Sequence, residues 1–408
     1  MIRLVVHVTL PDNTTLLCGE MVITGSDPRG RAEGAFRYMP EYLKHPKAFP
    51  LDPVALPLTS KEFQTGRPEG VHAVFEDALP DDWGRALLIK KAKLGRDKQT
   101  IPGMLAALGD GGLGALSFQS AQSRPKTDSS ASIKDLEALL DAATRYESGL
   151  PLDEEKLQLL YQSGSSPGGA RPKALCRKED GSYWITKFPR HQDTFHVEPI
   201  EAATLELAKR SGLLVPEFEI RDIGKRKVLF VKRFDISDHG GRYHMISMQT
   251  LLQAQGYYFL GYQNMFDVVK AHSCQPSVDV PLLFRQMVFN AAIGNTDDHL
   301  KNFCMLHKEP GYCLSPVYDV LPDLYEKREH SLSFPLGAGF LPPNGKMLQR
   351  IGESLKIDAA GMIIGTVRQA VSGWKKVFKC CNVPESDIQK LEWGINRRIE
   401  SLGDQKYL

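Results

Sequence analysis

The apolar segment VPLLFRQMVFNAAIG, residues 280–294, constrains the fold of this chain more than any other feature. Its apolar side chains surround the predicted helix almost completely, and a helix of that kind is buried inside a larger body. The pattern from about residue 240 to the end is mostly helical, and 42% of the chain is hydrophobic, which is enough for large cores. The sequence therefore predicts a large helical lobe over residues 240–408.

Three units with different patterns precede this lobe. Residues 1–118 begin with the alternating run MIRLVVHVTL, typical of a strand, and are rich in strand and turn signals near their start. Residues 119–132 are polar and lack apolar periodicity, so we interpret them as a linker or mobile loop. Residues 133–239 combine helical periodicity with hairpin signals. We expect an α+β protein with a β-rich first unit, a small α+β lobe and the helical lobe.

Turn and capping residues mark several elements within these units. A helix is predicted over residues 77–94, with Asp81 and Asp82 in its first turn, where the helix dipole favours negative charge. Ser132 is a candidate N-cap for the amphipathic helix that follows it. Glycines mark the other boundaries, namely a helix end at Gly212 and the turns of two hairpins at Gly181 and Gly224.

Composition argues against several classes of protein. The formal net charge is +2, so a whole-molecule electrostatic grip on nucleic acid is not indicated. The seven cysteines form no CxxC pair, which argues against a zinc site or a disulfide framework. No stretch reaches the roughly 18 apolar residues that span a membrane, and the N-terminus lacks the apolar region of a secretory signal. We expect a cytoplasmic protein without a membrane partner.

The glycine-rich stretch SSPGGARPKA, residues 165–174, has the composition of a phosphate-binding loop. Its glycines let backbone N–H groups approach an anion that a side chain would keep away, and its basic residues add positive charge. Its serines could serve that site or be modified by it. The residues concerned are Ser165, Ser166, Gly168, Gly169, Arg171 and Lys173.

The segment GNTDDHLKNF, residues 294–303, carries the strongest catalytic pattern. Four residues separate Asp297 from Asn302. Protein kinases use this spacing for an Asp that accepts the substrate hydroxyl proton and an Asn that holds Mg²⁺. Asp298 is the competing base, and the four-residue gap favours Asp297. Lys301 would add positive charge near the transferred phosphoryl group. Without other signals, the two aspartates could equally cap a helix or shape a turn.

A second metal carboxylate is predicted downstream of this segment. The short strand FCML, a turn and the returning strand YCLS lead to Asp319. Asn302 and Asp319 would offer hard oxygen ligands, which suit Mg²⁺ together with water and phosphate oxygens.

Two further residues turn these patterns into an ordered set. Lys187 lies in the predicted strand SYWITKFP, and Glu201 lies on the helix that follows. Alone, Lys187 would more often be a solvated strand lysine and Glu201 a residue on a helix surface. A strand lysine, a glutamate on the next helix, a long gap, the D-x-x-x-x-N segment and a later aspartate match the plan of a kinase.

With these motifs the chain resembles the HipA family of serine/threonine kinases, which are toxins of bacterial toxin–antitoxin pairs. The resemblance rests on TDDHLKNF, LSPVYDVLP and GGARPKA, and on ALPDDWGR in the first unit. It spans nearly the whole chain. It implies a protein-kinase-like bilobal fold with an additional β-rich N-terminal unit of HipA type.

The resemblance also implies roles for individual residues. Asp297 matches the catalytic base with Lys301 beside it, and Asn302 and Asp319 match the Mg²⁺ ligands. Ser166 matches the serine that such kinases autophosphorylate, with Ser165 as the other candidate. The residues implied in binding ATP are Ser166, Gly168, Gly169, Arg171, Lys173, Lys187, Glu201, Lys232, Phe234 and His299, of which Lys232 and Phe234 belong to the hinge VKRFD.

Partners follow from the same resemblance. Family members pair with a small helix-turn-helix antitoxin of HipB type, so contact with DNA would be indirect. The implied substrate is a protein, with aminoacyl-tRNA synthetases as the suggested class. This chain departs from familiar members in its two adjacent serines followed by Pro167, which leaves open which serine is used. Two other functions remain: a small-molecule phosphotransferase of kinase-like fold and a non-catalytic co-repressor that binds an antitoxin.

Overall fold

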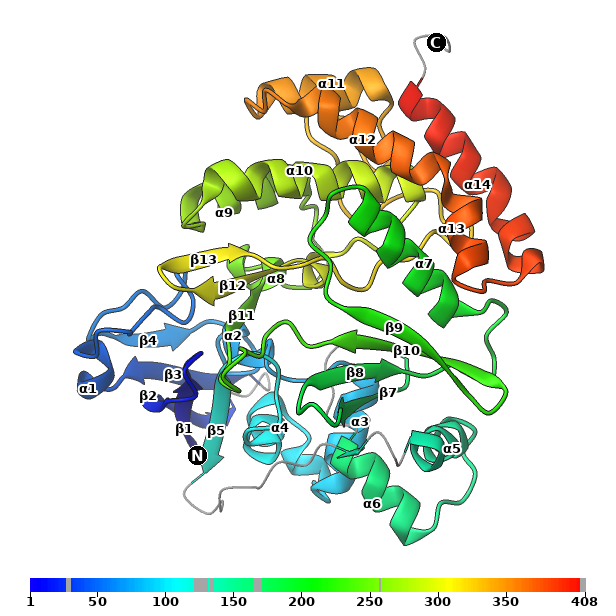
Figure 1. Ribbon diagram of the computed structural model, residues 1–408. Coiled ribbons are helices and arrows are strands. Elements are labelled where there is room, and N and C mark those ends of the chain that lie inside the picture. The colour runs from blue at the N-terminus through cyan, green and yellow to red at the C-terminus, as the bar shows by residue number, and fades with distance from the viewer. Residues whose placement is uncertain (27–30, 121–130, 133–135, 164–170, 257, 404–408) are drawn as a thin grey trace.

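The computed structural model describes residues 1–26, 31–120, 131–132, 136–163, 171–256 and 258–403. Within these ranges the chain forms three sheets, and the long helices α10, α11, α12 and α14 lie together at the top of Figure 1. In the same ranges, no helix combines the length and the apolar character needed to cross a bilayer.

The N-terminal unit is built on an antiparallel sheet with strand order β4-β3-β2-β1-β5. The predicted first strand is confirmed, because every second side chain from Leu4 to Val8 is fully buried. The elements are β1 (Ile2–Thr9), β2 (Thr15–Ser26), β3 (Ala32–Tyr38), α1 (Pro40–Leu43), β4 (Glu62–Thr65), α2 (Ala73–Glu76), α3 (Asp82–Lys91), α4 (Ile101–Leu108) and β5 (Leu116–Ser120).

The second unit holds the sheet β6-β7-β8-β10-β9, in which β6 pairs parallel to β7 and the other pairs are antiparallel. Both predicted hairpins are confirmed, and their turn glycines have positive φ, 83° at Gly181 and 58° at Gly224. The elements are β6 (Ala131–Ser132), α5 (Leu136–Glu147), α6 (Glu154–Ser163), β7 (Lys173–Arg177), β8 (Tyr183–Lys187), α7 (Val197–Arg210), β9 (Phe218–Ile223) and β10 (Arg226–Lys232).

The C-terminal lobe encloses α10 (Pro276–Ile293), the helix predicted to be buried. Its Leu283, Phe284, Met287 and Phe289 have no exposed surface, and the helix packs on α9, α12 and α14. The other elements are β11 (His244–Ser247), α8 (Met248–Leu251), α9 (Tyr262–His272), β12 (Cys304–Lys308), β13 (Gly311–Leu314), α11 (Gly345–Ser354), α12 (Ala360–Ser372), α13 (Trp374–Cys380) and α14 (Glu385–Gly403). The predicted strands before Asp319 are β12 and β13.

Helix α7 joins the second sheet to the C-terminal lobe. It contacts β9 and β10 on one side and α12 and α13 on the other (Figure 1). Its end at Gly212, which has φ 79°, is as predicted. This position makes α7 the element through which the two lobes meet.

Two predicted boundaries are wrong. The helix expected over residues 77–94 is shorter, because α3 begins only at Asp82 and ends at Lys91. Pro80 explains the late start, since the residue before a proline is forced away from helical angles. The expected first-turn aspartates do sit at the start of α3, with Asp81 as the N-cap residue.

The predicted linker, residues 119–132, is also bounded differently. Its first two residues extend β5 to Ser120, and its last two form β6 against β7. Ser132 therefore belongs to a strand, and the described part of the next helix begins at Leu136. Both ends of the segment belong to strands because they form hydrogen bonds with neighbouring strands. The polarity of the local sequence does not reveal such bonds.

The N-terminal unit is not an independent body. One continuous apolar core runs from its sheet, at Val6 and Phe36, into the C-terminal lobe at Phe284 and Phe303. A second core packs Trp83 of α3 against α5 and the β7-β8-β10 sheet. The N-terminal unit therefore supports both lobes that form the candidate site.

Candidate functional site

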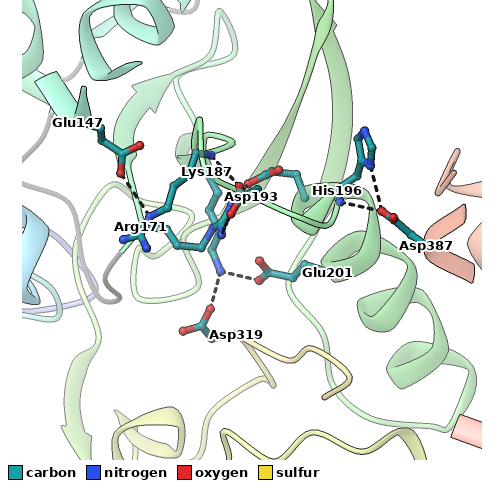
Figure 2. A network of polar contacts seen from close by, with 10 residues as sticks. Glu147, Arg171, Lys187, Asp193, His196, Glu201, Asp319 and Asp387 are labelled. Carbon is teal, nitrogen blue, oxygen red and sulfur yellow. Dashed lines mark hydrogen bonds and ion pairs between the residues drawn. The ribbon is translucent and has the colours of Figure 1, made fainter. Parts of the chain in front are cut away.

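Lys187 lies at the centre of the candidate site. Its Nζ donates to Glu201 Oε1 at 2.5 Å and to Asp319 Oδ1 at 2.8 Å (Figure 2). Lys187 ends β8, Glu201 lies on α7, and Asp319 follows β13, so three separate elements converge here. The predicted strand lysine and helix glutamate are thus both buried, with 12% and 4% of their side chains exposed. Burial of both charges is acceptable because they pair with each other.

Asp319 has an unusual backbone and a stabilised charge. Its φ is 55°, in the left-handed region that few residues other than glycine adopt, although aspartate tolerates it. Desolvation opposes its ionisation, but the charges of Lys187 and Lys173 outweigh that effect and lower the pKa of Asp319. His299 acts in the same direction more weakly. Strained backbone of this kind is found preferentially at functional sites.

Lys173 lies directly across from Lys187 in the β7–β8 ladder, so both side chains extend from the same face of the sheet. Only 4% of Lys173 is exposed. Burial lowers its pKa to about 8, the attraction of Asp319 opposes that shift, and repulsion from Lys187 adds to it. The two ammonium groups of Lys173 and Lys187 therefore lie close to two carboxylates, those of Asp319 and Glu201, so the charges of this cluster balance.

The D-x-x-x-x-N segment lies in the loop between α10 and β12. Asn302 donates from Nδ2 to the carbonyl oxygen of Asp297 at 2.8 Å, so the two predicted residues are joined across the loop. The Asp297 side chain is exposed, as is that of Lys301. The carbonyl oxygen of Lys301 accepts a hydrogen bond from the Tyr318 hydroxyl at 2.7 Å, which ties this loop to the residue before Asp319.

Asp298, the competing base, is fully buried and committed elsewhere. Its Oδ2 accepts from the Tyr262 hydroxyl at 2.6 Å and contacts His330 Nδ1 at 2.9 Å. Its Oδ1 accepts from the backbone N–H of Ser331 at 2.8 Å. These bonds hold the loop from behind and leave Asp298 no access to a substrate.

The predicted hinge follows β10. The backbone N–H groups of Lys232 and Arg233 donate to the carbonyl oxygens of Glu217 and Tyr183. These two N–H groups are therefore already paired with protein acceptors. The Phe234 ring packs on Tyr318 at a centroid distance of 5.6 Å. The Lys232 ammonium binds Glu217 at the surface, so its side chain is turned to a partner other than a nucleotide.

Arg171 is engaged by carboxylates. Its guanidinium donates to both oxygens of Asp193, at 2.8 and 2.5 Å, and to Glu198 Oε1 at 2.9 Å. The sequence suggested that this charge faces a phosphate; in the structure the guanidinium contacts carboxylates, and its contact with ATP stays a prediction. The remaining loop residues of that prediction, Ser165, Ser166, Gly168 and Gly169, lie outside the described residues.

The N-terminal unit contributes charges that sequence reasoning did not assign to the site. Asp77 accepts from the backbone N–H of Ser247 at 2.8 Å and lies near Lys301; burial raises its pKa to about 6. The charge of Asp81 acts on Lys173. Asp81 belongs to ALPDDWGR, on which the resemblance rests in part, and Asp77 directly precedes it; only the fold reveals that both lie near Lys301 and Lys173.

Comparisons with known proteins agree with this architecture. The model of the HipA-like C-terminal domain matches residues 165–374, about half of the chain, and the model of the HipA N-terminal domain matches residues 23–119. This chain belongs to the HipA family. The first match runs from the second sheet through most of the C-terminal lobe, and the second covers most of the β-rich N-terminal unit.

Solved structures give the fold of this HipA-family chain. A chain of the Shewanella oneidensis complex of HipA, HipB and its operator DNA matches with a TM-score of 0.68. It shares 17% identity over 97% of this chain and 96% of that one. At that identity the likeness shows a common fold, and it bears out the α+β, kinase-like architecture expected from the sequence.

Two weaker matches carry less. The proinflammatory kinase CtkA of Helicobacter pylori matches 57% of the chain with a TM-score of 0.39 and 16% identity, too low for an argument. "Putative kinase Y4mE" of Sinorhizobium fredii is 35% identical over 71 residues. This segment spans 16% of the HipA-family chain and 17% of Y4mE.

The donor set at the site fits a magnesium ion. Asn302 commits its Nδ2 to Asp297, which leaves the amide oxygen for a cation. Asp319 gives one carboxylate oxygen to Lys187 and has 36% of its side chain exposed, which leaves the other oxygen. An amide and a carboxylate oxygen, completed by water and phosphate, are the ligands that Mg²⁺ prefers.

Proposed function

We propose that this HipA-family chain is an ATP- and Mg²⁺-dependent protein serine/threonine kinase. The observation that carries the proposal is the bonding of Lys187 to both Glu201 and Asp319, next to a loop that exposes Asp297. In protein kinases, the equivalent lysine, glutamate and metal-binding aspartate must be in place together for activity.

Each residue then has a defined task. Lys187 and Lys173 supply the positive charge that binds and orients the phosphates of ATP. Asp297 accepts the proton of the attacking serine or threonine hydroxyl, for which its exposed carboxylate is accessible. Asn302 and Asp319 would hold Mg²⁺, which neutralises charge on the transferred phosphoryl group when bound. Phe234, at the hinge, would contact the adenine.

The proposed targets include the chain itself. We propose autophosphorylation of Ser166 or Ser165 in the glycine-rich loop, which would inactivate the kinase because a phosphate adds a charge of about −1.5 to −2 where ATP phosphates bind. As a growth-arresting toxin, the chain would act in the cytoplasm on a host protein, with aminoacyl-tRNA synthetases as the first candidates. A HipB-like antitoxin would bind it and provide the contact with DNA.

Incubation of the purified chain with γ-labelled ATP and Mg²⁺ tests this proposal. Label should enter the protein, and mass spectrometry should find phosphate on the peptide that contains Ser165 and Ser166. The Asp297→Asn variant should incorporate none. A non-catalytic co-repressor would give no label in either protein, and a small-molecule phosphotransferase would transfer label only when its small substrate is added.

A further inference from the structure

The ion pair between Lys187 and Glu201 depends on a short connector. Lys187 ends β8, residues 188–196 follow, and Glu201 lies in the second turn of α7. The Glu201 carboxylate can meet the Lys187 ammonium only while the start of α7 stays close to the end of β8. The contacts of the connector therefore decide whether this pair forms.

The second sheet anchors the connector through Arg171. The Arg171 guanidinium holds both oxygens of Asp193, within the connector (Figure 2). It also donates to Glu198 in the first turn of α7. Asp193 Oδ2 also accepts from the backbone N–H of Arg190 at 2.7 Å. A planar guanidinium bound to two oxygens fixes orientation as well as distance.

The C-terminal lobe anchors the same segment through Asp387 of α14. Asp387 Oδ2 accepts from the backbone N–H of His196 at 2.8 Å and contacts the ring Nδ1 of His196 at 2.9 Å (Figure 2). The Asp387 side chain is 2% exposed. His196 is the N-cap residue of α7 and forms no capping bond with its own side chain, so the Asp387 carboxylate lies at the positively charged end of that helix.

A second residue of α14 reinforces this contact. The Lys390 ammonium donates to the carbonyl oxygen of Thr194 at 3.1 Å and lies 4.8 Å from the centre of the Phe195 ring. Three consecutive residues before α7, Thr194 to His196, are therefore bound by one turn of α14. The two partners His196 and Asp387 are 191 positions apart in the sequence.

We propose that Asp387 is a positioning residue for phosphoryl transfer. From α14 it fixes the start of α7 and so holds Glu201 against Lys187, while Arg171 fixes the same turn from the other lobe. The role of Glu201 rests on the proposed function, because the pair matters only if Lys187 binds ATP. The helix that carries this glutamate controls activity in protein kinases generally, and in this chain its anchor is a helix near the C-terminus.

Hydrogen exchange tests the anchor without relying on catalysis. Asp387→Ala should raise the exchange rate of amides in residues 196–202 at least about fivefold, because a lost anchor lets this turn open locally. Asp387→Asn, which keeps an acceptor oxygen but not the charge, should show a smaller increase and serves if the alanine variant does not fold. The matched control is Glu385→Ala on the same helix, whose exposed carboxylate pairs with Lys379 and should leave these amides unchanged. Wild-type exchange rates in Asp387→Ala would overturn the proposal.

A double-mutant cycle then separates positioning from a general structural role. Asp387→Asn should lower the first-order rate constant of autophosphorylation about tenfold. In the Glu201→Gln background the same change should lower this rate constant no further, because its effect passes through Glu201. Losses that multiply would show that Asp387 acts by another route and would overturn the proposal. If the wild type transfers no phosphate at all, the proposed function fails, and the exchange result still decides whether Asp387 anchors α7.

Discussion

Asp297 and Asp298 are neighbours in the chain but lie in opposite environments. The Asp297 side chain is exposed, whereas Asp298 has no exposed surface and binds Tyr262, His330 and the backbone of Ser331. The segment spacing favoured Asp297 as the base, and burial removes its competitor. The pair thus divides two tasks that the sequence alone could not assign: one carboxylate is available for chemistry, and the other holds the loop.

Replacement of Asp297 should stop catalysis without harming the fold. Asp297→Asn keeps the size of the side chain but removes the proton acceptor, and general base catalysis contributes typically about 10²–10⁴-fold. We expect at least about a hundredfold loss of phosphoryl transfer and an unchanged unfolding midpoint. Transfer near the wild-type rate would exclude Asp297 as the base.

Replacement of Asp298, in contrast, should lower the stability of the fold. Asp298→Ala leaves the Tyr262 hydroxyl and His330 Nδ1 without their shared acceptor inside the core, whereas the Ser331 N–H keeps the carbonyl oxygen of Thr296 as an acceptor. Buried groups left unpaired in this way cost about 1–3 kcal/mol each, so the free energy of unfolding should fall by about 2 kcal/mol or more. Urea unfolding of the Asp298→Ala and Asp297→Asn variants measures the contrast. Equal stabilities would mean that the buried network contributes nothing.

Asp319 and Asp297 should differ in their effect on nucleotide binding. Asp319→Ala removes a proposed metal ligand and also a negative charge beside Lys187 and Lys173, so ATP binding should lose its dependence on Mg²⁺. Asp297→Asn should keep that dependence. Calorimetry with a non-hydrolysable ATP analogue, with and without Mg²⁺, compares the two variants. A Mg²⁺ dependence that survives in Asp319→Ala would contradict its assignment as a ligand.

Local sequence signals predicted the secondary structure of the site better than the contacts between residues of different elements. Gly181 and Gly224 marked the hairpin turns correctly, and the spacing from Asp297 to Asn302 marked two residues that the fold does join. In contrast, Arg171 was read from its neighbours in a glycine-rich loop, although its partner Asp193 lies 22 positions away. Contacts of this kind are set by packing between elements, on which periodicity and turn chemistry carry no information.

The same limit explains the N-terminal unit. Its strand pattern was readable, but a sequence pattern could not show that Asp77 reaches Ser247 or that one apolar core continues into the C-terminal lobe. The late start of the helix predicted over residues 77–94 is different, because Pro80 in the sequence already disfavours helical angles at the residue before it.

Acidification should weaken the contact between the N-terminal unit and β11. His244 donates from Nε2 to the Leu51 carbonyl oxygen at 2.8 Å, and its buried Nδ1 has no partner among the described residues. Burial lowers the pKa of His244 to about 4, below the ordinary 6.5, so the unfolded chain binds a proton first as the pH falls. The neutral His244 ring contributes fully to the free energy of unfolding above about pH 6.5, and this contribution is lost as the pH falls towards 4. Between pH 7 and pH 5 the loss is about 2 kcal/mol.

A pair of histidine variants isolates this effect. His244→Gln can retain a donor to Leu51 but does not titrate, so its stability should fall less between pH 7 and pH 5 than that of the wild type. His239→Gln, at an exposed position, should follow the wild type. The comparison is needed because the raised pKa of Asp77, about 6, stabilises the folded chain as the pH falls. If the free energy of unfolding depended on pH in the same way in all three proteins, His244 would not cause the loss of stability in acid.

Adjacent hinge residues allow a test of how firmly the N-terminal unit is held. Arg233 and Asp235 form a buried pair at 2.5 Å, and Asp235 also accepts from the backbone N–H of Gly114 at 2.8 Å. Asp235→Ala removes the partner of the buried Arg233 charge and the acceptor of the Gly114 N–H. The free energy of unfolding should therefore fall by about 3–5 kcal/mol. The exposed pair of Lys232 and Glu217 is next to it, and Lys232→Ala should cost less than about 1 kcal/mol. Urea unfolding would measure both losses, and limited proteolysis should cut residues 110–114 faster in Asp235→Ala alone, because that loop loses its bond to the hinge. Equal losses in the two variants would mean that the buried pair does not hold the N-terminal unit in place.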